Sequence, residues 1–256
     1  DATRKYIAQA VLTDNRRFIQ SEARDQAASG ADYINLCAAV FGPDEEKRLA
    51  WMIRAVQEVT DTPLCIDSPH PAVIEKVLPL VRHRPMINAV TLDEGRDGTV
   101  LRLAVDRSAK VIASCQGEEF NAETAEEKFE IAGRLIRMVT GAGVPADDLY
   151  IDPMVYSLST NPSAARATLD AIGKIMTAFP GVHTTCCLST VSYGLPARSL
   201  LNRTFLAAAM ERGLDSAILD TTDGELAAVI LAGRLVSGRE RDCLRYIRAF
   251  REGRLG

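Results

Sequence analysis

The sequence lacks the features that mark proteins with charged or lipid partners. Its 30 basic and 34 acidic residues give a net charge of −4, no polybasic stretch is present, and aromatic residues make up only 5% of the chain. Proteins that bind nucleic acids usually carry a basic surface with aromatic residues beside it. No stretch approaches the roughly 18 apolar residues that a membrane span needs. We therefore expect neither a nucleic-acid partner nor a membrane partner.

The sequence also lacks targeting and metal-binding signals. The first residues do not form a charged segment followed by an apolar one, so a cytoplasmic location is expected. Neither C-x-x-C spacing nor any other zinc-ligand spacing is present, so no protein-bound metal is expected. Four of the six cysteines lie in or just after apolar runs, where a reduced thiol packs as a small hydrophobe. The six are Cys37, Cys65, Cys115, Cys186, Cys187 and Cys243.

What the sequence does contain is a series of short apolar runs that each end on a small polar residue. Six of these ends are Asn35, Asp67, Asn88, Asp152, Thr185 and Asp220, and a seventh run, residues 110–114, ends on Ser114. The ends lie on average about 31 residues apart, which is the length of one strand-plus-helix unit. In a barrel of parallel strands, the strand ends meet at one mouth. We therefore expect these polar side chains to form one site.

Segments of helical periodicity separate the apolar runs, at residues 17–29, 44–59 and 122–139, with another at 3–12. Expected helix starts are Pro71, Pro162 and Asp223, and expected stops are Gly30, Gly141 and Gly213. Runs that are apolar on both faces and alternate with helices predict a parallel sheet. The 256 residues suit one α/β domain, a (β/α)8 TIM barrel over residues 1–256. Because seven strands are visible, the first of eight is expected to lie before residue 1.

The predicted mouth contains carboxylates, carboxamides and hydroxyls, but few basic groups. The loop after the last strand, residues 221–224, carries an acidic residue where a phosphate would be repelled. A carboxylate accepts two parallel hydrogen bonds, and a carboxamide supplies a donor and an acceptor. Such a site suits a neutral heterocycle that is rich in N–H donors, and a pterin has an edge of that kind.

Seven stretches, in this order and at these spacings, carry a family resemblance. They read GADYIN at 30–35, PLCIDSP at 63–69, IN at 87–88, YIDP at 150–153, LSTN at 158–161, LSTVSYGLP at 188–196 and LNRTF at 201–205. Together they resemble the methyltetrahydrofolate:corrinoid protein methyltransferases, over nearly the whole chain. The resemblance implies a pterin-binding barrel, usually a homodimer. It implies exchange of a methyl group between N5 of tetrahydrofolate and the cobalt of a corrinoid (cobalamin) carried by a partner protein, as in demethylation systems.

The resemblance also implies roles for individual residues. Asp67, Asn88 and Asp152 match the family's pterin-binding residues, and Ser189 and Arg198 match further groups around the ring. Three positions depart from the family pattern and are counted in the same site. The family's aspartate is Asn35, its glycine is Cys187, and the asparagine that hydrogen-bonds near N5 is Thr190. We expect Thr190, Asp67 and Asp152 to be the catalytic residues.

The change at Thr190 bears on the direction of transfer. Removing a methyl group from N5 requires protonation of, or a strong hydrogen bond to, the leaving nitrogen, and a threonine hydroxyl reaches less far than a carboxamide. Transfer from methylcobamide to tetrahydrofolate needs no acid and is the expected direction. One alternative is a catalytically impaired protein that binds the pterin or docks a corrinoid protein. Another is dihydropteroate synthase, but the Lys and Arg-x-His elements of that enzyme are absent from suitable places.

Overall fold

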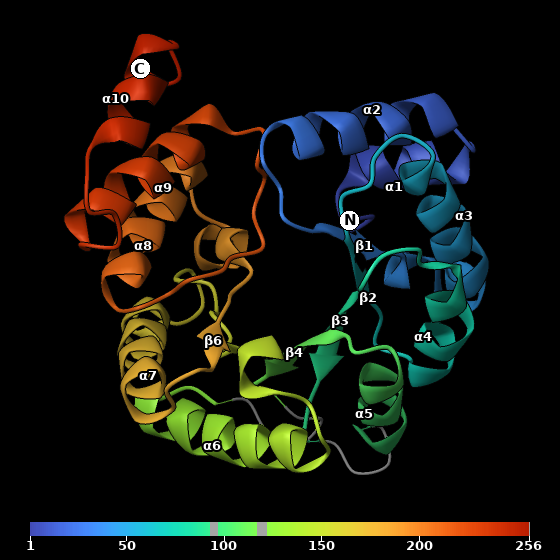
Figure 1. The fold of residues 1–256 in the computed structure, drawn as a ribbon, viewed down its shortest axis with the longest axis horizontal. Helices are drawn as coiled ribbons and strands as arrows, with labels where there is room; N and C mark the ends of the chain where they lie inside the picture. The colour runs from blue at the N-terminus through green and yellow to red at the C-terminus, as the bar shows by residue number, and fades with distance from the viewer. Residues whose placement is uncertain (93–96, 117–121, 256) are drawn as a thin grey trace. The chain divides into compact units, whose positions relative to one another are not determined.

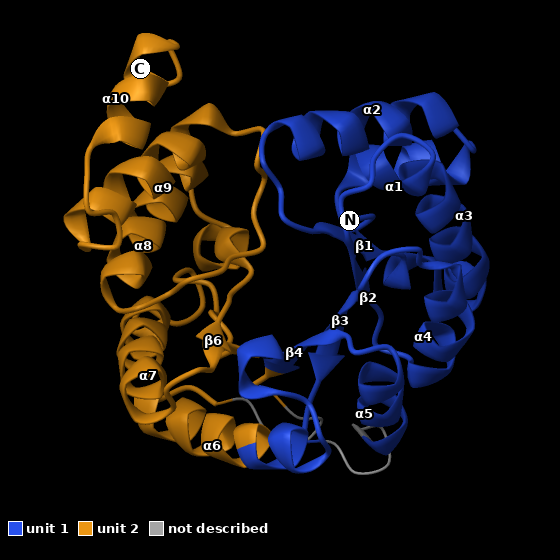
Figure 2. Ribbon diagram, in the orientation of Figure 1, with its two compact units in different colours: residues 1–113, 137–149 blue, residues 114–136, 150–256 orange. Residues whose placement is uncertain are grey.

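The computed structural model describes residues 1–92, 97–116 and 122–255. These residues form two compact units, each built from two separate parts of the chain (Figure 2). Unit 1 contains residues 1–113 and 137–149, and unit 2 contains residues 114–136 and 150–256. The expectation of one domain over residues 1–256 stays a prediction.

Unit 1 is built on parallel strands that pair in chain order. They are β1 (Ile34–Cys37), β2 (Leu64–Asp67), β3 (Met86–Val90) and β4 (Lys110–Ser114), of which Ser114 falls in unit 2. Its helices are α1 (Lys5–Leu12), α2 (Arg16–Ala28), α3 (Glu45–Gln57), α4 (Pro71–Val77) and α5 (Asp97–Asp106), with short 3-10 turns η1 (Ala39–Asp44), η2 (Leu78–Leu80) and η3 (Ala146–Asp148). Helices α3, α4 and α5 lie along one side of β1 to β3 (Figure 1).

Unit 2 continues the same alternation. Its strands β5 (Leu149–Asp152) and β6 (His183–Thr184) are parallel, and Leu149 is counted with unit 1. Its helices are α7 (Ala164–Ala178), α8 (Arg198–Glu211), α9 (Gly224–Val236) and α10 (Leu244–Arg251), together with the 3-10 turn η4 (Leu188–Ser192), and each of these four helices packs against the next (Figure 1). Helix α6 (Ala125–Gly141) contributes residues to both units.

The helices bury the faces that their sequence periodicity predicts. In α3, Leu49, Met52, Ile53 and Val56 recur at helical spacing and are at most 2% exposed. Asp223 caps α9, since its side chain accepts hydrogen bonds from the first free backbone N–H groups of that helix. The expected helix starts at Pro71 and Asp223 are thus confirmed, whereas α7 begins two residues after Pro162.

Two predicted strand ends are wrong. Asn35 is the second residue of β1, which runs on to Cys37 because the ladder with β2 continues as far as the Cys37–Asp67 pair. Asn88 is the third residue of β3, which runs on to Val90. A polar residue therefore ends an apolar run in the sequence without ending the strand, because strand pairing is set by backbone groups.

Two further differences concern the last strand and one helix stop. The expected strand ending at Asp220 is reduced to a single bridge between Ile218 and Cys187. Gly141 is the last residue of α6 rather than a residue beyond it, and Gly143 adopts the left-handed conformation, with φ of 105°. Gly30 and Gly213 do follow their helices with positive φ.

Candidate functional site

In unit 1, three of the predicted site residues form one hydrogen-bonded group on adjacent strands. The Asn35 amide Nδ2 on β1 donates to Asp67 Oδ2 on β2 over 3.0 Å. Asn88 on β3 pairs in register with Asp67 and also hydrogen-bonds its carboxylate. Asp67 thus lies between two carboxamides, one from each neighbouring strand.

The surroundings of Asp67 act on the pKa of its carboxyl in opposite directions. Burial raises the pKa of the Asp67 carboxyl, and the hydrogen bonds from Asn35 and Asn88 oppose that rise. The Oδ1 atom of Asn35 is buried and accepts no hydrogen bond from the described residues. A buried acceptor without a donor costs free energy, so this atom is suited to an N–H donor on a ligand.

Glu45 is a neighbour of this group that the sequence did not single out. Its side chain is 1% exposed, and its Oε2 atom lies 2.7 Å from His70 Nδ1 in the loop after β2. Its charge adds to the rise in the pKa of Asp67. Glu45 occupies the first turn of α3, where an acidic residue is ordinary, so the sequence offers no signal for its burial.

In unit 2, Asp152 ends β5 as predicted, and the residue is 8% exposed. Its Oδ1 atom accepts a hydrogen bond from the Met154 backbone N–H over 2.8 Å. Thr185 follows the register pair Ile151–Thr184, as Asp152 does, and its buried hydroxyl has no partner among the described residues. Ser114 ends β4 and donates to the Met154 sulfur over 3.0 Å.

Lys128 in α6 is a second residue that sequence analysis missed. Its side chain is fully buried, and its ammonium group donates to the backbone carbonyls of Pro153 and Met154, just after Asp152. Burial lowers the pKa of Lys128 to about 8 and raises the pKa of Asp152 to about 6, while the interaction between the two opposite charges works against both shifts.

The remaining predicted residues lie on η4 and at the start of α8. Cys187 and Ser189 are exposed, and the Thr190 side chain is partly buried. The Arg198 guanidinium donates to the Ser189 carbonyl over 2.7 Å and to the Ser192 hydroxyl over 3.1 Å. These hydrogen bonds from Arg198 therefore stabilise the segment that carries Ser189 and Thr190.

Asp220, by contrast, is engaged in a local turn. Its Oδ1 atom accepts hydrogen bonds from the backbone N–H of Thr222 over 3.1 Å and from the Thr222 hydroxyl over 2.6 Å. This arrangement is typical of an aspartate that stabilises the loop it belongs to.

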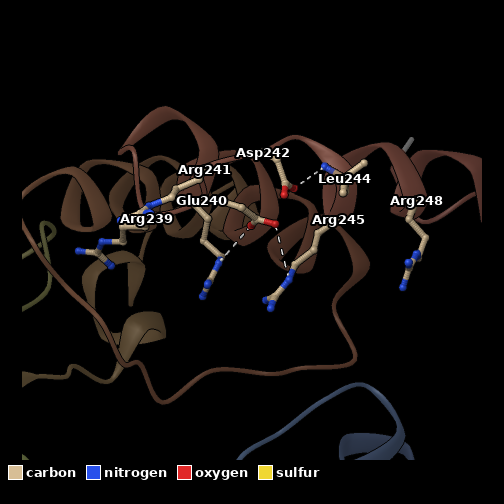
Figure 3. Close-up of a pocket in the computed structure, with 8 residues that line it drawn as sticks. Arg239, Glu240, Arg241, Asp242, Leu244, Arg245 and Arg248 are labelled. Atoms are coloured by element: carbon tan, nitrogen blue, oxygen red, sulfur yellow. Dashed lines mark hydrogen bonds and ion pairs between the residues drawn. The ribbon is translucent and has the colours of Figure 1, made fainter.

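A pocket of about 390 Å³ near the C-terminus contains none of the predicted site residues (Figure 3). Five arginines line it, and the Glu240 carboxylate lies 3.5 Å from Arg234 Nε and 3.6 Å from Arg245 Nε. The signal in the sequence is the seven arginines, against three acidic residues, between positions 234 and 254. In the part of the chain that the structure describes, no three His, Cys, Asp or Glu side chains are grouped to hold a metal ion, and no helix is long and apolar enough to cross a membrane.

Comparison with known proteins gives consistent results at the levels of sequence and fold. The chain is 32% identical to the methylcorrinoid:tetrahydrofolate methyltransferase of Eubacterium limosum, over 98% of this chain and 93% of that protein. It is also 32% identical to methionine synthase of Mycobacterium tuberculosis, over 84% of this chain but only 19% of that longer protein.

Solved structures of dihydropteroate synthases share the fold. The enzyme from Thermus thermophilus matches with a TM-score of 0.64 and 20% identity, over 83% of this chain and 86% of that one. The enzyme from Xanthomonas albilineans matches with a TM-score of 0.67 and 19% identity, over 84% of this chain and 83% of that one. These matches confirm the expected α/β barrel of the pterin-binding type. A model of the family described as pterin binding enzyme matches residues 6–220, and the chain belongs to that family.

Proposed function

We propose that this protein transfers a methyl group between a corrinoid and N5 of tetrahydrofolate, in the direction from methylcorrinoid to folate. The observation that carries the proposal is the end-to-end similarity to a methylcorrinoid:tetrahydrofolate methyltransferase. The carboxylate and carboxamide groups at Asp67, Asn88 and Asp152 support it, since they occupy the positions at which the family resemblance expects pterin-binding residues.

The pterin ring would be recognised by its N–H edge. A buried carboxylate such as that of Asp67 or that of Asp152 can accept a hydrogen bond from an amino group or a ring N–H. The Asn88 and Asn35 carboxamides add a donor or an acceptor beside Asp67, and the unpartnered Oδ1 of Asn35 is available to a ligand donor. The hydroxyls of Thr185 and Ser189 are further candidates for contact with the ring.

The residue near N5 favours one direction of transfer. The N5 lone pair forms the new bond to the methyl carbon, the electron pair of the cobalt–carbon bond leaves with the corrinoid, and the N5 proton is released. This sequence needs alignment of the reacting atoms more than it needs an acid. The Thr190 hydroxyl, on a partly buried side chain, would serve as a single donor or acceptor for N5 in this step.

The corrinoid would reach the site on a partner protein, as the resemblance implies. We further propose that the protein acts as a homodimer in the cytoplasm. Size-exclusion chromatography with light scattering measures the number of copies, and a monomer at micromolar concentration would contradict the dimer.

The test combines binding and turnover. Calorimetry with tetrahydrofolate should show saturable binding, and adding tetrahydrofolate to the protein with methylcobalamin should cause the absorbance of methylcobalamin to decline with formation of 5-methyltetrahydrofolate. Binding without methyl transfer, with both free methylcobalamin and a methylated corrinoid protein, would favour the impaired binding protein instead. Condensation of a pterin pyrophosphate with 4-aminobenzoate would favour dihydropteroate synthase.

A matched pair of variants distinguishes loss of the binding site from a general loss of folding or stability. Asp67→Asn removes the charge at the centre of the unit 1 group. Asp220→Asn makes the same change at an aspartate that serves a local turn. We expect the first variant to lose folate affinity and the second to keep it, and equal losses would contradict the proposed site.

A further inference from the structure

Lys128 is buried, which is unusual for a lysine near the charged start of a helix. Its side chain is 0% exposed, and it lies within α6 among residues that the sequence presents as a charged helical segment. Its Nζ atom lies 2.8 Å from the Pro153 carbonyl oxygen, 2.7 Å from the Met154 carbonyl oxygen and 4.7 Å from the centre of the Tyr156 ring. A lysine is almost never fully buried unless its charge is compensated. Here the compensation comes from the loop that leaves β5.

Lys128 is connected to Asp152 through one peptide group. The peptide group between Pro153 and Met154 accepts a hydrogen bond from the Lys128 ammonium at its oxygen, and donates one from its N–H to Asp152 Oδ1 over 2.8 Å. Hydrogen bonds in such a chain polarise one another, so the ammonium strengthens the bond to the carboxylate. Met154, whose N–H and carbonyl both take part in these contacts, has φ of 55°, a conformation that non-glycine residues rarely adopt.

We infer that Lys128 is a positioning residue for the pterin site, which fixes the Asp152 carboxylate and supports its charge through the peptide group between Pro153 and Met154. This inference rests on the proposed function, because it assigns Asp152 to the folate ring. Asp152 Oδ1 is occupied by the Met154 N–H, and the described residues donate no hydrogen bond to Oδ2. The carboxylate is thus held by one oxygen and available to a ligand at the other.

The charges of the pair make the inference testable by pH. Burial brings the pKa of Asp152 up to about 6 and that of Lys128 down to about 8, so both groups are charged between these values. The other ionisable groups that interact with the pair are Cys115 after β4, Glu123 before α6, Glu127 in the first turn of α6, Tyr156 after β5 and Cys186 after β6. Without the ammonium, the carboxylate would keep its burial and lose its nearby positive charge, so its pKa would rise further.

The experiment measures the affinity for tetrahydrofolate by calorimetry from pH 5.5 to pH 9, for the wild-type protein and for Lys128→Met. In the wild-type protein, affinity should fall below pH 6, as Asp152 takes up a proton. In Lys128→Met, this acidic fall should move to higher pH. A move of about two pH units corresponds to a loss of affinity of about tenfold at pH 7.

Thr168→Val is the matched control. The Thr168 hydroxyl also donates to the Met154 carbonyl, over 3.0 Å, and is equally buried, but it carries no charge. Loss of this hydroxyl should weaken folate binding by the same factor at every pH, without moving the pH at which the affinity falls. Lys128→Met would refute the inference if it had the wild-type pH profile, or if it lost the same factor in affinity at every pH, as a purely structural residue would.

Two outcomes keep the inference separate from the proposed function. If Lys128→Met does not fold, Lys128→Gln takes its place, because glutamine keeps a hydrogen-bond donor and removes the charge, and an acidic fall that stays near pH 6 in this variant excludes a role for the Lys128 charge. If the wild-type protein binds no tetrahydrofolate at any pH, the proposed function is wrong and the inference that rests on it is wrong as well. If the wild-type protein binds tetrahydrofolate and the affinity of the variant falls at the same pH as that of the wild type, the inference alone is overturned.

Discussion

Replacing Asp152 by asparagine should stabilise the folded protein at neutral pH while weakening folate binding. Asp152 is 8% exposed, and burial raises the pKa of its carboxyl from 3.8 to about 6. A shift of this size corresponds to about 3 kcal/mol of unfavourable free energy for the charged form in the folded protein. An asparagine at this position keeps an oxygen that can accept the Met154 N–H and removes the charge.

The sign of the pH dependence follows from the direction of the shift. Between pH 3.8 and pH 6 the folded protein holds a proton on Asp152 that the unfolded chain has released, so the stability of the wild-type protein falls as pH rises through this window. The variant lacks this fall. Its stability relative to wild type should therefore increase by about 2 kcal/mol between pH 4.5 and pH 7.5.

Urea unfolding of both proteins at several pH values measures this difference, since contributions from groups that do not interact with Asp152 cancel to first order. Lys128 stays protonated across the lower part of the window, because its pKa is about 8, so the change reports mainly on Asp152. A stability difference that is independent of pH would refute the reasoning, as would one that shrinks with rising pH. Calorimetry on the same samples should show folate affinity reduced at least tenfold.

Three further substitutions test other parts of the structure. Thr190→Asn should raise the rate of methyl removal from methyltetrahydrofolate at saturating substrate about tenfold or more, and equal, unchanged rates in both directions would contradict the explanation. Asp67→Ala should weaken tetrahydrofolate binding about tenfold to a hundredfold in calorimetry, because it leaves two carboxamides without their shared partner, and wild-type affinity would exclude Asp67 from the site. Gly213→Ala should lower the free energy of unfolding by about 1–3 kcal/mol, because φ is 115° and a new Cβ would lie 2.9 Å from Met176 Cγ, whereas Gly141→Ala, with open space around it, should be neutral in the same urea titration.

The repeating strand and helix pattern could be predicted because it depends on local sequence. The strands ending at Asp67 and Asp152 have the predicted bounds, since there the apolar run and the backbone pairing stop together. At Asn35 and Asn88 the apolar run stops but the backbone pairing continues, because a polar side chain leaves the backbone ladder intact. The sequence therefore placed these two residues on the correct strands but misplaced the ends of those strands.

The supporting residues could not be predicted in the same way. Lys128 stands in the sequence Glu126-Glu127-Lys128, which is typical of a solvated helix face, and its compensation comes from carbonyl groups about 25 residues further along the chain. The burial of Glu45 could not be predicted for a similar reason, since Glu45 lies in α3 and its partner His70 lies in the loop after β2, 25 residues further along the chain. Charge compensation over such distances depends on tertiary packing, which a local pattern does not report.

The unequal burial of the six thiols has a practical consequence. Cys37, Cys65, Cys115 and Cys186 are buried, and burial raises the pKa of each of them, so they remain protonated and poorly nucleophilic at neutral pH. Cys187 and Cys243 are exposed. A maleimide dye added to the native protein should therefore couple at these two positions first. With Cys243→Ser, a single fluorescent reporter would sit beside Ser189 and Thr190 and could follow ligand arrival in real time.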